Sequence, residues 1–205
     1  MIRIVDYGVG NIQAFLNLFK RLGIEARRAE TPAQLHDATR LILPGVGHFD
    51  HAMQRLSDSG FRPSLEERVL GAKVPIIGVC VGMQMLAEGS EEGSLPGLNW
   101  IPGRVRSFAS YPACAGFALP HMGWNQLEPM TGSRLFSNGF DDPPQFYFLH
   151  SYFFDAADRN DVAATASYCI KFDAVVTRGN IHGVQCHPEK SHHWGEQLLR
   201  NFVEL

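Results

Sequence analysis

The chain has 205 residues, of which 45% are hydrophobic and 19% charged, and its formal net charge is −3 at pH 7. This length suits a single domain over residues 1–205 with a buried core. The weak negative charge offers no basic field to nucleic acid or to an anionic membrane, so we expect neither as a partner. No apolar run nears the ~18 residues of a membrane span, and the first residues lack a secretory signal pattern.

The residues from 2 to 88 alternate short β-rich runs with helical patterns. Strands are predicted at 2–6, 25–30, 40–47 and 75–79, and helices at 12–23, 31–38, 64–72 and 82–88. Such alternation is typical of an α/β fold, a mostly parallel sheet with helices on both faces. Ligands on these sheets gather at the carboxyl ends of the strands. Turns fall at such ends at Gly8, Gly10, Gly45, Gly47 and Cys80.

The second half of the chain favours strands joined by short turns. Strands are predicted at 103–108, 146–154, 161–168, 173–179 and 180–187, which indicates antiparallel strands added to the sheet. The segment 110–125 is rich in Pro, Gly and aromatic residues and is predicted to be a structured loop. The apolar spacing of 194–205 predicts a closing helix.

Cysteine is scarce in this chain. Cys80, Cys114, Cys169 and Cys186 form no C-x-x-C pair and are sparse for a disulfide framework. We therefore expect free thiols in a reducing cytoplasm. No partner is identifiable for Cys114 or Cys169.

Cys80 stands in Gly78-Val79-Cys80-Val81-Gly82, where an apolar run ends and a helical pattern begins. G-x-C-x-G is the thiol counterpart of the nucleophile elbow, a sharp strand-to-helix turn. Glycine suits the flanking positions because side chains would crowd the turn, and the start of the next helix favours a thiolate. The N–H of Val81 would face a developing oxyanion. The alternative is a buried structural cysteine between two tightly packed glycines.

A nucleophile of this kind needs a base, and the base needs a group that orients it. His187 follows an apolar run, and Glu189 stands two residues later across Pro188, which stiffens the chain. Together with Cys80 they predict a Cys-His-Glu triad. A surface loop with incidental charge is the alternative for the histidine and the glutamate. Strand alternation sends Cys186 to the opposite face from His187, so we expect Cys186 in the core.

Five segments resemble, in order, the motifs of class I glutamine amidotransferase domains: "PGVG", "GVCVGMQML", "HMGWN", "FYFLHSY" and "GVQCHPEKSHHWGEQLLRNF". Within that family they resemble the glutaminase subunits of imidazole glycerol phosphate synthases, over essentially the whole chain. The resemblance implies a flavodoxin-like fold and glutamine hydrolysis through a thioester on Cys80, without an organic cofactor. It also implies a heterodimer with a (β/α)8-barrel subunit, which uses the ammonia to make imidazole glycerol phosphate and AICAR in histidine biosynthesis.

The resemblance assigns further residues around the nucleophile. A peptide N–H in the loop Gly45, Val46, Gly47 turns inward to complete the oxyanion hole with Val81, and a simple turn is the alternative. Gln84 and Glu92 hold the α-amino and α-carboxylate end of glutamine, and helix solvation is the alternative. On the other side of the substrate the resemblance places His150, Ser151 and Tyr152.

The resemblance also assigns a partner interface, formed by Gly10, Asn11, His121, Trp124 and Lys190. A core position is the alternative for Trp124, and an unpaired surface charge is the alternative for Lys190. The adjacent His192 and His193 lack an accompanying set of acidic or cysteine ligands, so we expect no metal.

Three other functions remain open. Less usual motif variants, among them "GHFDHAM" and "GVCVGM", resemble a paralogous branch whose glutaminase and barrel supply ammonia for amidating a sugar in surface-polysaccharide synthesis. A stand-alone γ-glutamyl cysteine hydrolase would need no partner. A non-enzymatic binding subunit is the third alternative, and the intact triad argues against it.

Overall fold

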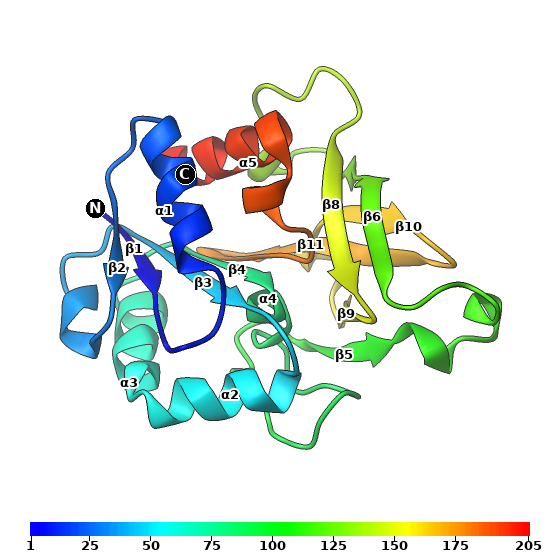
Figure 1. Cartoon of the computed structure of the whole chain (residues 1–205), viewed down its shortest axis with the longest axis horizontal. Coiled ribbons are helices and arrows are strands. Elements are labelled where there is room, and N and C mark those ends of the chain that lie inside the picture. The colour runs from blue at the N-terminus through cyan, green and yellow to red at the C-terminus, as the bar shows by residue number, and fades with distance from the viewer.

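The computed structural model describes residues 1–205, arranged as a sheet between two layers of helices (Figure 1). The helices are α1 Ile12–Arg21, α2 Phe49–Asp58, α3 Phe61–Glu66, α4 Val81–Gln84 and α5 His192–Glu204. The strands are β1 Ile2–Val5, β2 Ala26–Ala29, β3 Arg40–Gly45, β4 Ile76–Cys80, β5 Gly103–Ser107, β6 His121–Gln126, β7 Glu128–Pro129, β8 Gln145–His150, β9 Tyr152–Ala156, β10 Val162–Ser167, β11 Lys171–Arg178 and β12 Ile181–Val184.

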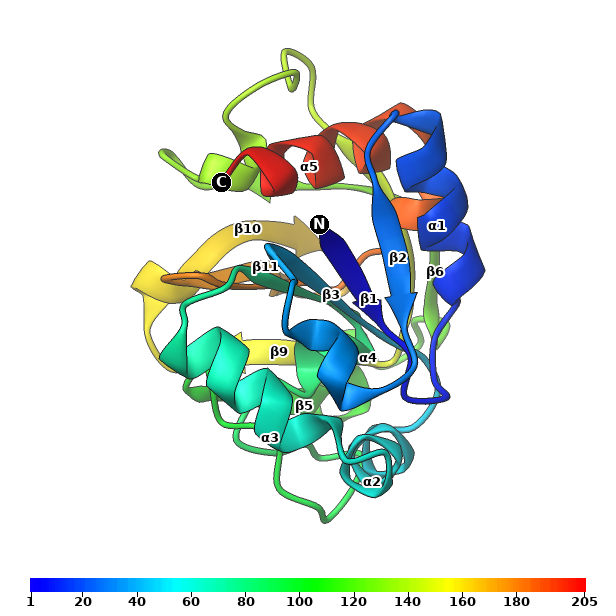
Figure 2. The same cartoon turned by 90° about the vertical axis from the view of Figure 1, so that its left-hand side faces the viewer.

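The main sheet confirms the predicted mixture of parallel and antiparallel strands. Its order is β2-β1-β3-β4-β12-β11-β10-β7, with β9 paired to β11 and β5 paired to β9. The strands from β2 to β12 in this order are parallel, and the pairs beyond β12 are antiparallel. Figure 2 shows α1 and α5 on one face and α2, α3 and α4 on the other. Both faces of the central strands are therefore buried, which is why β4 is apolar along its length.

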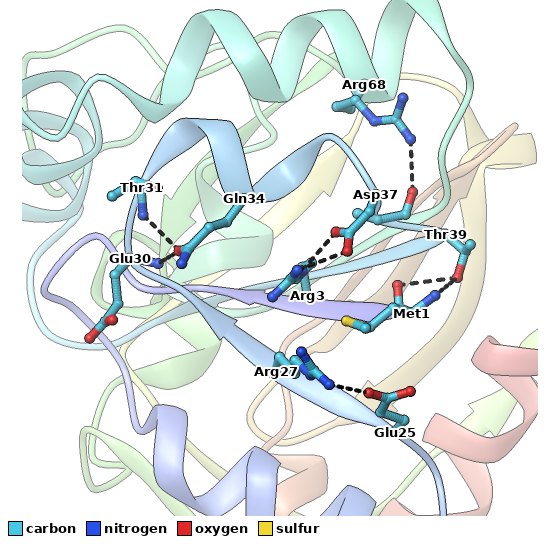
Figure 3. Close-up of polar contacts among 11 residues, drawn as sticks. Met1, Arg3, Glu25, Arg27, Glu30, Thr31, Gln34, Asp37, Thr39 and Arg68 are labelled. Carbon is cyan, nitrogen blue, oxygen red and sulfur yellow. Dashed lines mark hydrogen bonds and ion pairs between the residues drawn. The ribbon is translucent and has the colours of Figure 1, made fainter.

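The edge of the sheet at β1 and β2 is held by polar contacts (Figure 3). The guanidinium of Arg3 donates two hydrogen bonds of 2.9 Å to the carboxylate of Asp37. Gln34 Oε1 accepts the backbone N–H groups of Glu30 at 2.6 Å and Thr31 at 3.1 Å. These contacts fix the turn after β2, where only a short 3₁₀ segment, Pro32–Leu35, forms within the predicted helix 31–38.

Two further helices differ from the sequence prediction. The prediction missed α2, although its buried residues Phe49, Ala52, Met53 and Leu56 recur at helical spacing. The helix predicted at 82–88 is only the short α4. It stops because the carbonyl groups of Met85, Leu86 and Ala87 accept hydrogen bonds from residues 98–101 instead of continuing a helix.

The predicted strand 146–154 is two strands that belong to different sheets. β8 pairs with β6 in a separate two-stranded sheet, and β9 pairs with β5 and β11 in the main sheet. The chain crosses between the sheets at Ser151. The predicted loop 110–125 accordingly ends in β6, because its last residues pair with β8 in register from His121↔His150 onward.

The expectation that all four thiols are free is wrong for two of them. Cys114 and Cys169 form a disulfide with their Cα atoms 4.9 Å apart, while Cys80 and Cys186 remain free. Cys114 lies in the loop between β5 and β6, and Cys169 lies in the turn between β10 and β11. Folding brings these segments together across 55 positions of sequence. The bond therefore ties the loop that leads into β6 to the main sheet.

No helix of the chain is both long enough and apolar enough to cross a membrane.

Candidate active site

Cys80 is the last residue of β4 and directly precedes α4. Its backbone has φ 55° and ψ −114°, a positive φ that residues other than glycine rarely adopt. Strained backbone of this kind persists only where the surrounding structure enforces it, and it clusters at functional sites. The turn has the geometry expected of a nucleophile elbow.

Close backbone packing explains the two glycines of the motif. A Cβ atom on Gly78 would collide with the carbonyl oxygen of Gly82, and a Cβ atom on Gly82 would collide with the carbonyl oxygen of Leu43 in β3. Both obstacles are backbone atoms of the sheet or the helix. Glycine at these positions therefore lets α4 begin directly against the ends of β3 and β4.

His187 and Glu189 form a buried pair at the end of β12. The Nδ1 atom of His187 lies 2.9 Å from Oε1 of Glu189, and their side chains are 4% and 3% exposed. Because the carboxylate only accepts, Nδ1 carries the hydrogen, which leaves Nε2 for Cys80. Burial by itself would lower the pKa of His187, but hydrogen bonds with Cys80 and Glu189 and the charges of both groups raise that pKa to about 9. The site therefore favours an imidazolium beside the sulfur at neutral pH.

The cysteine and the histidine open into one cavity of about 330 Å³, a size typical of small-molecule sites. Residues predicted for the oxyanion hole and for substrate binding line it: Val46, Gly47, Val81, Gln84, Glu92, His150, Ser151 and Tyr152. Gly45 lies just behind, paired with Cys80 between β3 and β4. Lys190, predicted for the partner interface, also lines this cavity. The fold thus gathers residues from five separate segments around the sulfur.

Two polar residues that line the cavity, Gln84 and Glu92, already form hydrogen bonds with other parts of the chain. Gln84 Nε2 donates to the carbonyl of Tyr152 and to Oε1 of Gln185, at 3.1 Å each. Glu92 Oε2 accepts the backbone N–H of Phe49, the first residue of α2, at 2.8 Å. One oxygen of Glu92 therefore anchors the start of α2.

His150 belongs to a chain of hydrogen bonds with a fixed direction. Its Nδ1 donates to the carbonyl of Tyr152 at 2.8 Å, so its Nε2 accepts from Nδ1 of His121 at 3.0 Å. Nε2 of His121 then accepts from the amide of Asn125 at 3.2 Å. Burial lowers the pKa of His150 to about 3 and that of His121 to about 4. Both rings are therefore neutral at pH 7, and they hold β6 against β8.

The two predicted interface residues of β6, Trp124 and His121, differ in exposure. Trp124 is 48% exposed and stacks on His192, so it is not a core residue. The side chain of His121 is only 3% exposed and turned toward His150, so the assignment of this side chain to a partner contact does not fit the structure. Strand alternation is the reason, because Met122 and Trp124 occupy positions of β6 whose side chains are exposed.

The other interface candidates lie in loops beside the site. Gly10 packs against Pro44, and Asn11 accepts the backbone N–H of Ala14 as the N-cap of α1. Lys190 is exposed and its ammonium lies 5.7 Å from the centre of the Tyr147 ring.

Cys186 is fully buried, as predicted, and burial raises its pKa well above the ordinary range. No group of three or more His, Cys, Asp or Glu side chains is arranged to hold a metal ion.

Sequence reasoning missed two residues that touch the site, Tyr7 and Gln185. Gln185 is fully buried and its Nε2 lies 3.8 Å from Cys80 Sγ. The alternation that separated Cys186 from His187 puts Gln185 on the same face as His187, which is the signal that could have found it. Tyr7 is buried against Pro44, and no local pattern distinguishes it.

Comparison with known proteins gives a consistent family. The family model for class-I glutamine amidotransferases matches residues 3–205. A protein of Bdellovibrio bacteriovorus named imidazole glycerol phosphate synthase subunit HisH is 55% identical over the full length of both chains. Proteins of Leptospira interrogans, with the same name, and Pseudomonas aeruginosa, named subunit HisH 2, are 46% and 44% identical, again over both full lengths.

Solved structures agree on the fold. A crystal structure of a glutamine amidotransferase superposes with a TM-score of 0.75 at 21% identity, and it covers 99% of this chain and 97% of that one. A structure of PurLQS from Thermotoga maritima gives a TM-score of 0.70 at 17% identity, covering 99% of this chain and 97% of that one. With the family model matched over nearly the whole sequence, this chain belongs to the class-I glutamine amidotransferases.

Proposed function

We propose that this chain is the glutaminase subunit of an imidazole glycerol phosphate synthase in histidine biosynthesis. One observation carries the proposal: Cys80 on its strained elbow and His187, paired with Glu189, open into the same cavity. The full-length similarity to proteins named as such subunits supports the choice of synthase. The product of the reaction is ammonia for a (β/α)8-barrel partner.

The first half of the reaction breaks the amide bond of glutamine. In the resting pair Nε2 of His187 already holds the proton of Cys80, and the thiolate attacks the side-chain carbonyl carbon. The backbone N–H of Val81 and a peptide of the Gly45–Gly47 loop stabilise the oxyanion. His187 then gives its proton to the leaving nitrogen, and ammonia departs from a γ-glutamyl thioester.

The second half restores the enzyme. His187, now neutral, removes a proton from a water molecule that attacks the thioester carbonyl. The tetrahedral intermediate collapses and glutamate leaves, which restores the Cys80 thiolate beside a protonated His187. Glu189 keeps the imidazole oriented throughout because its carboxylate accepts from Nδ1. One glutamine and one water thus give one glutamate and one ammonia.

Exposed apolar side chains around the opening of the cavity support a partner interface at this position. Val46 and Leu149 line the cavity and are 43% and 37% exposed. Leu149 pairs across β6 and β8 with Met122, which is 66% exposed, and Trp124 follows two positions along. This apolar patch is where we place the barrel subunit, so that ammonia leaves Cys80 directly into it.

Glutamate release from glutamine tests the proposal. The purified chain is assayed alone and with barrel partners from its genome, each with and without the ribonucleotide substrate of the histidine pathway. We expect weak activity alone, strong activity with a barrel and its ribonucleotide, and none for Cys80→Ser or His187→Ala. Full activity of Cys80→Ser would contradict the proposed chemistry.

The same assay separates the alternatives. Stimulation by a second barrel that is indifferent to the ribonucleotide would move the chain to the surface-polysaccharide branch. Full turnover without any partner would make it a stand-alone γ-glutamyl hydrolase. Failure of a glutamine-analogue electrophile to label Cys80 would leave only a binding subunit.

A further inference from the structure

Gln185 lies beside the sulfur of Cys80. β12 pairs with β4 in parallel register, with Gly183 opposite Gly78 and Val184 opposite Val79. Continuing this register sets Gln185 next to Cys80. Because residues two apart on an extended chain share a face, Gln185 and His187 reach the sulfur from the same strand end. The amide nitrogen of Gln185 is 3.8 Å from Sγ, and the residue has no exposed surface.

The hydrogen bonds around Gln185 fix which end of its amide meets the sulfur. The carbonyl of Tyr152 only accepts, so Gln84 must turn its Nε2 toward it, at 3.1 Å. The second hydrogen of the same nitrogen goes to Oε1 of Gln185, also at 3.1 Å. Gln185 must therefore present its NH₂ group, a donor, to Cys80.

We infer that Gln185 is a further catalytic residue, which donates a hydrogen bond to the Cys80 thiolate and so stabilises the nucleophile before it attacks. A donor favours the thiolate because a sulfur anion accepts hydrogen bonds far better than a neutral thiol does. Gln84 is the positioning residue that keeps this donor aimed. The inference deepens the proposed function, on which it rests in taking Cys80 as the nucleophile.

Gln185 acts here in a site with several titratable groups. Those that face the sulfur or its cavity come from different elements: Tyr7 before α1, Glu92 after α4, His150 in β8, Tyr152 in β9, and His187, Glu189 and Lys190 after β12. Replacing Gln185 removes none of these titratable groups. A change in the pH response of the thiol can then be assigned to the amide.

Alkylation of Cys80 by iodoacetamide measures the thiolate without glutamine or a partner. The rate is followed by mass spectrometry of the Cys80 peptide over a range of about pH 5 to 10, which spans the usual thiol titration. We compare the full chain with Gln185→Met, which keeps length and apolar volume but has no donor. Cys186→Ala is the matched control, because it disturbs the same buried strand end on the opposite face.

We expect the midpoint of the rate–pH curve to rise by about one pH unit in Gln185→Met, since a donor to an anion is lost. A more basic thiolate is also a better nucleophile, so the plateau at high pH should rise about threefold while the rate well below the midpoint falls about threefold. Cys186→Ala should leave the midpoint in place. A merely misplaced sulfur would lower the rate equally at every pH.

An unchanged midpoint in a folded Gln185→Met protein would overturn the inference. Folding is checked by thermal unfolding, and if this variant does not fold, Gln185→Leu and Gln84→Leu give the same comparison. The alkylation readout requires no glutamine hydrolysis, so failure of the inference and failure of the proposed function can be told apart. A chain that fails to hydrolyse glutamine but shows the shifted midpoint would keep the thiolate donor, whereas an active glutaminase with an unshifted midpoint would lose it.

Discussion

The hydroxyl of Tyr7 donates a 2.7 Å hydrogen bond to the carbonyl oxygen of Pro44, and both groups are buried. Tyr7 belongs to the loop after β1, and Pro44 lies near the end of β3, directly before Gly45, the first of the residues predicted for the oxyanion hole. Burial and the charge of Cys80 raise the pKa of Tyr7, so the phenol stays protonated and keeps its donor. A single side chain thus joins a predicted interface loop to the edge of the active site.

Replacing Tyr7 by phenylalanine tests how much its hydrogen bond to Pro44 contributes to stability. Tyr7→Phe should lower the free energy of unfolding by about 1 kcal/mol, since it leaves a buried carbonyl without its partner. Urea unfolding measures the loss. Tyr168→Phe is the matched control because its hydroxyl donates an equal 2.7 Å bond to Ala118 at an exposed position. If Tyr168→Phe lost more unfolding free energy than Tyr7→Phe, the buried hydrogen bond of Tyr7 would not be the more stabilising of the two.

Acid should destabilise the fold through three buried histidines. Burial lowers the pKa of His150 to about 3 and those of His121 and His182 to about 4. Below the unfolded value of ~6.5 the unfolded chain binds protons that the folded chain does not. Stability should therefore fall as pH drops from about 6.5 to 4, by up to about 1.4 kcal/mol per pH unit for each ring.

His187 has the opposite sign and a different pH window. Its folded pKa of about 9 lies above the unfolded value, so its contribution is complete below pH ~6.5 and is lost as pH rises through 9. Urea unfolding at several pH values checks both limbs. His182→Gln, which removes one titrating ring far from Cys80, should flatten the acid limb and leave the alkaline limb unchanged. An acid limb as steep as in the native chain would count against this assignment.

The disulfide should contribute several kcal/mol of stability. Cys114–Cys169 closes a loop with a sequence separation of 55 residues, for which the loop-entropy model gives up to about 4 kcal/mol. A reductant should therefore lower the unfolding free energy of the oxidised chain by about 2 to 4 kcal/mol. Thiol titration should find two free thiols before reduction and four after it. Cys114→Ser with Cys169→Ser is the control, and an equal effect of reductant on it would assign the loss elsewhere.

Trp124 should anchor the partner if the proposed docking surface is right. Trp124→Ala removes an exposed aromatic ring from the patch around the cavity, and we expect the barrel subunit to bind at least about tenfold more weakly. Calorimetric titration of the two proteins gives the dissociation constant. Met130→Ala is the control, because Met130 is 49% exposed, against 48% for Trp124, but lines a different cavity together with Arg134 and Asn160. Equal weakening by both variants would argue against a specific surface.

Local sequence patterns determined most elements of the fold and indicated the three residues of the proposed triad. Alternating apolar runs and glycine turns predict a parallel sheet. Strand burial requires apolar residues and positive φ favours glycine, and both preferences can be read within a few residues. The same is true of Cys80 between two glycines and of His187 two residues before Glu189. The missed helix α2 also carried its signal, the spacing of Phe49, Ala52, Met53 and Leu56.

Only the tertiary structure decided which distant side chains meet. The pairing of Cys114 with Cys169 and the bond from Tyr7 to Pro44 depend on how separate strands pack, and no local period records that. The division of 146–154 between two sheets and the inward turn of His121 likewise follow from strand pairing. Gln185 is only two residues before His187 in the sequence. Its contact with Cys80 nevertheless depends on the register of β12 on β4, which the sequence pattern does not reveal. Long-range register arises from packing of the whole sheet, so the sequence alone determined the chemical groups and the fold determined their contacts.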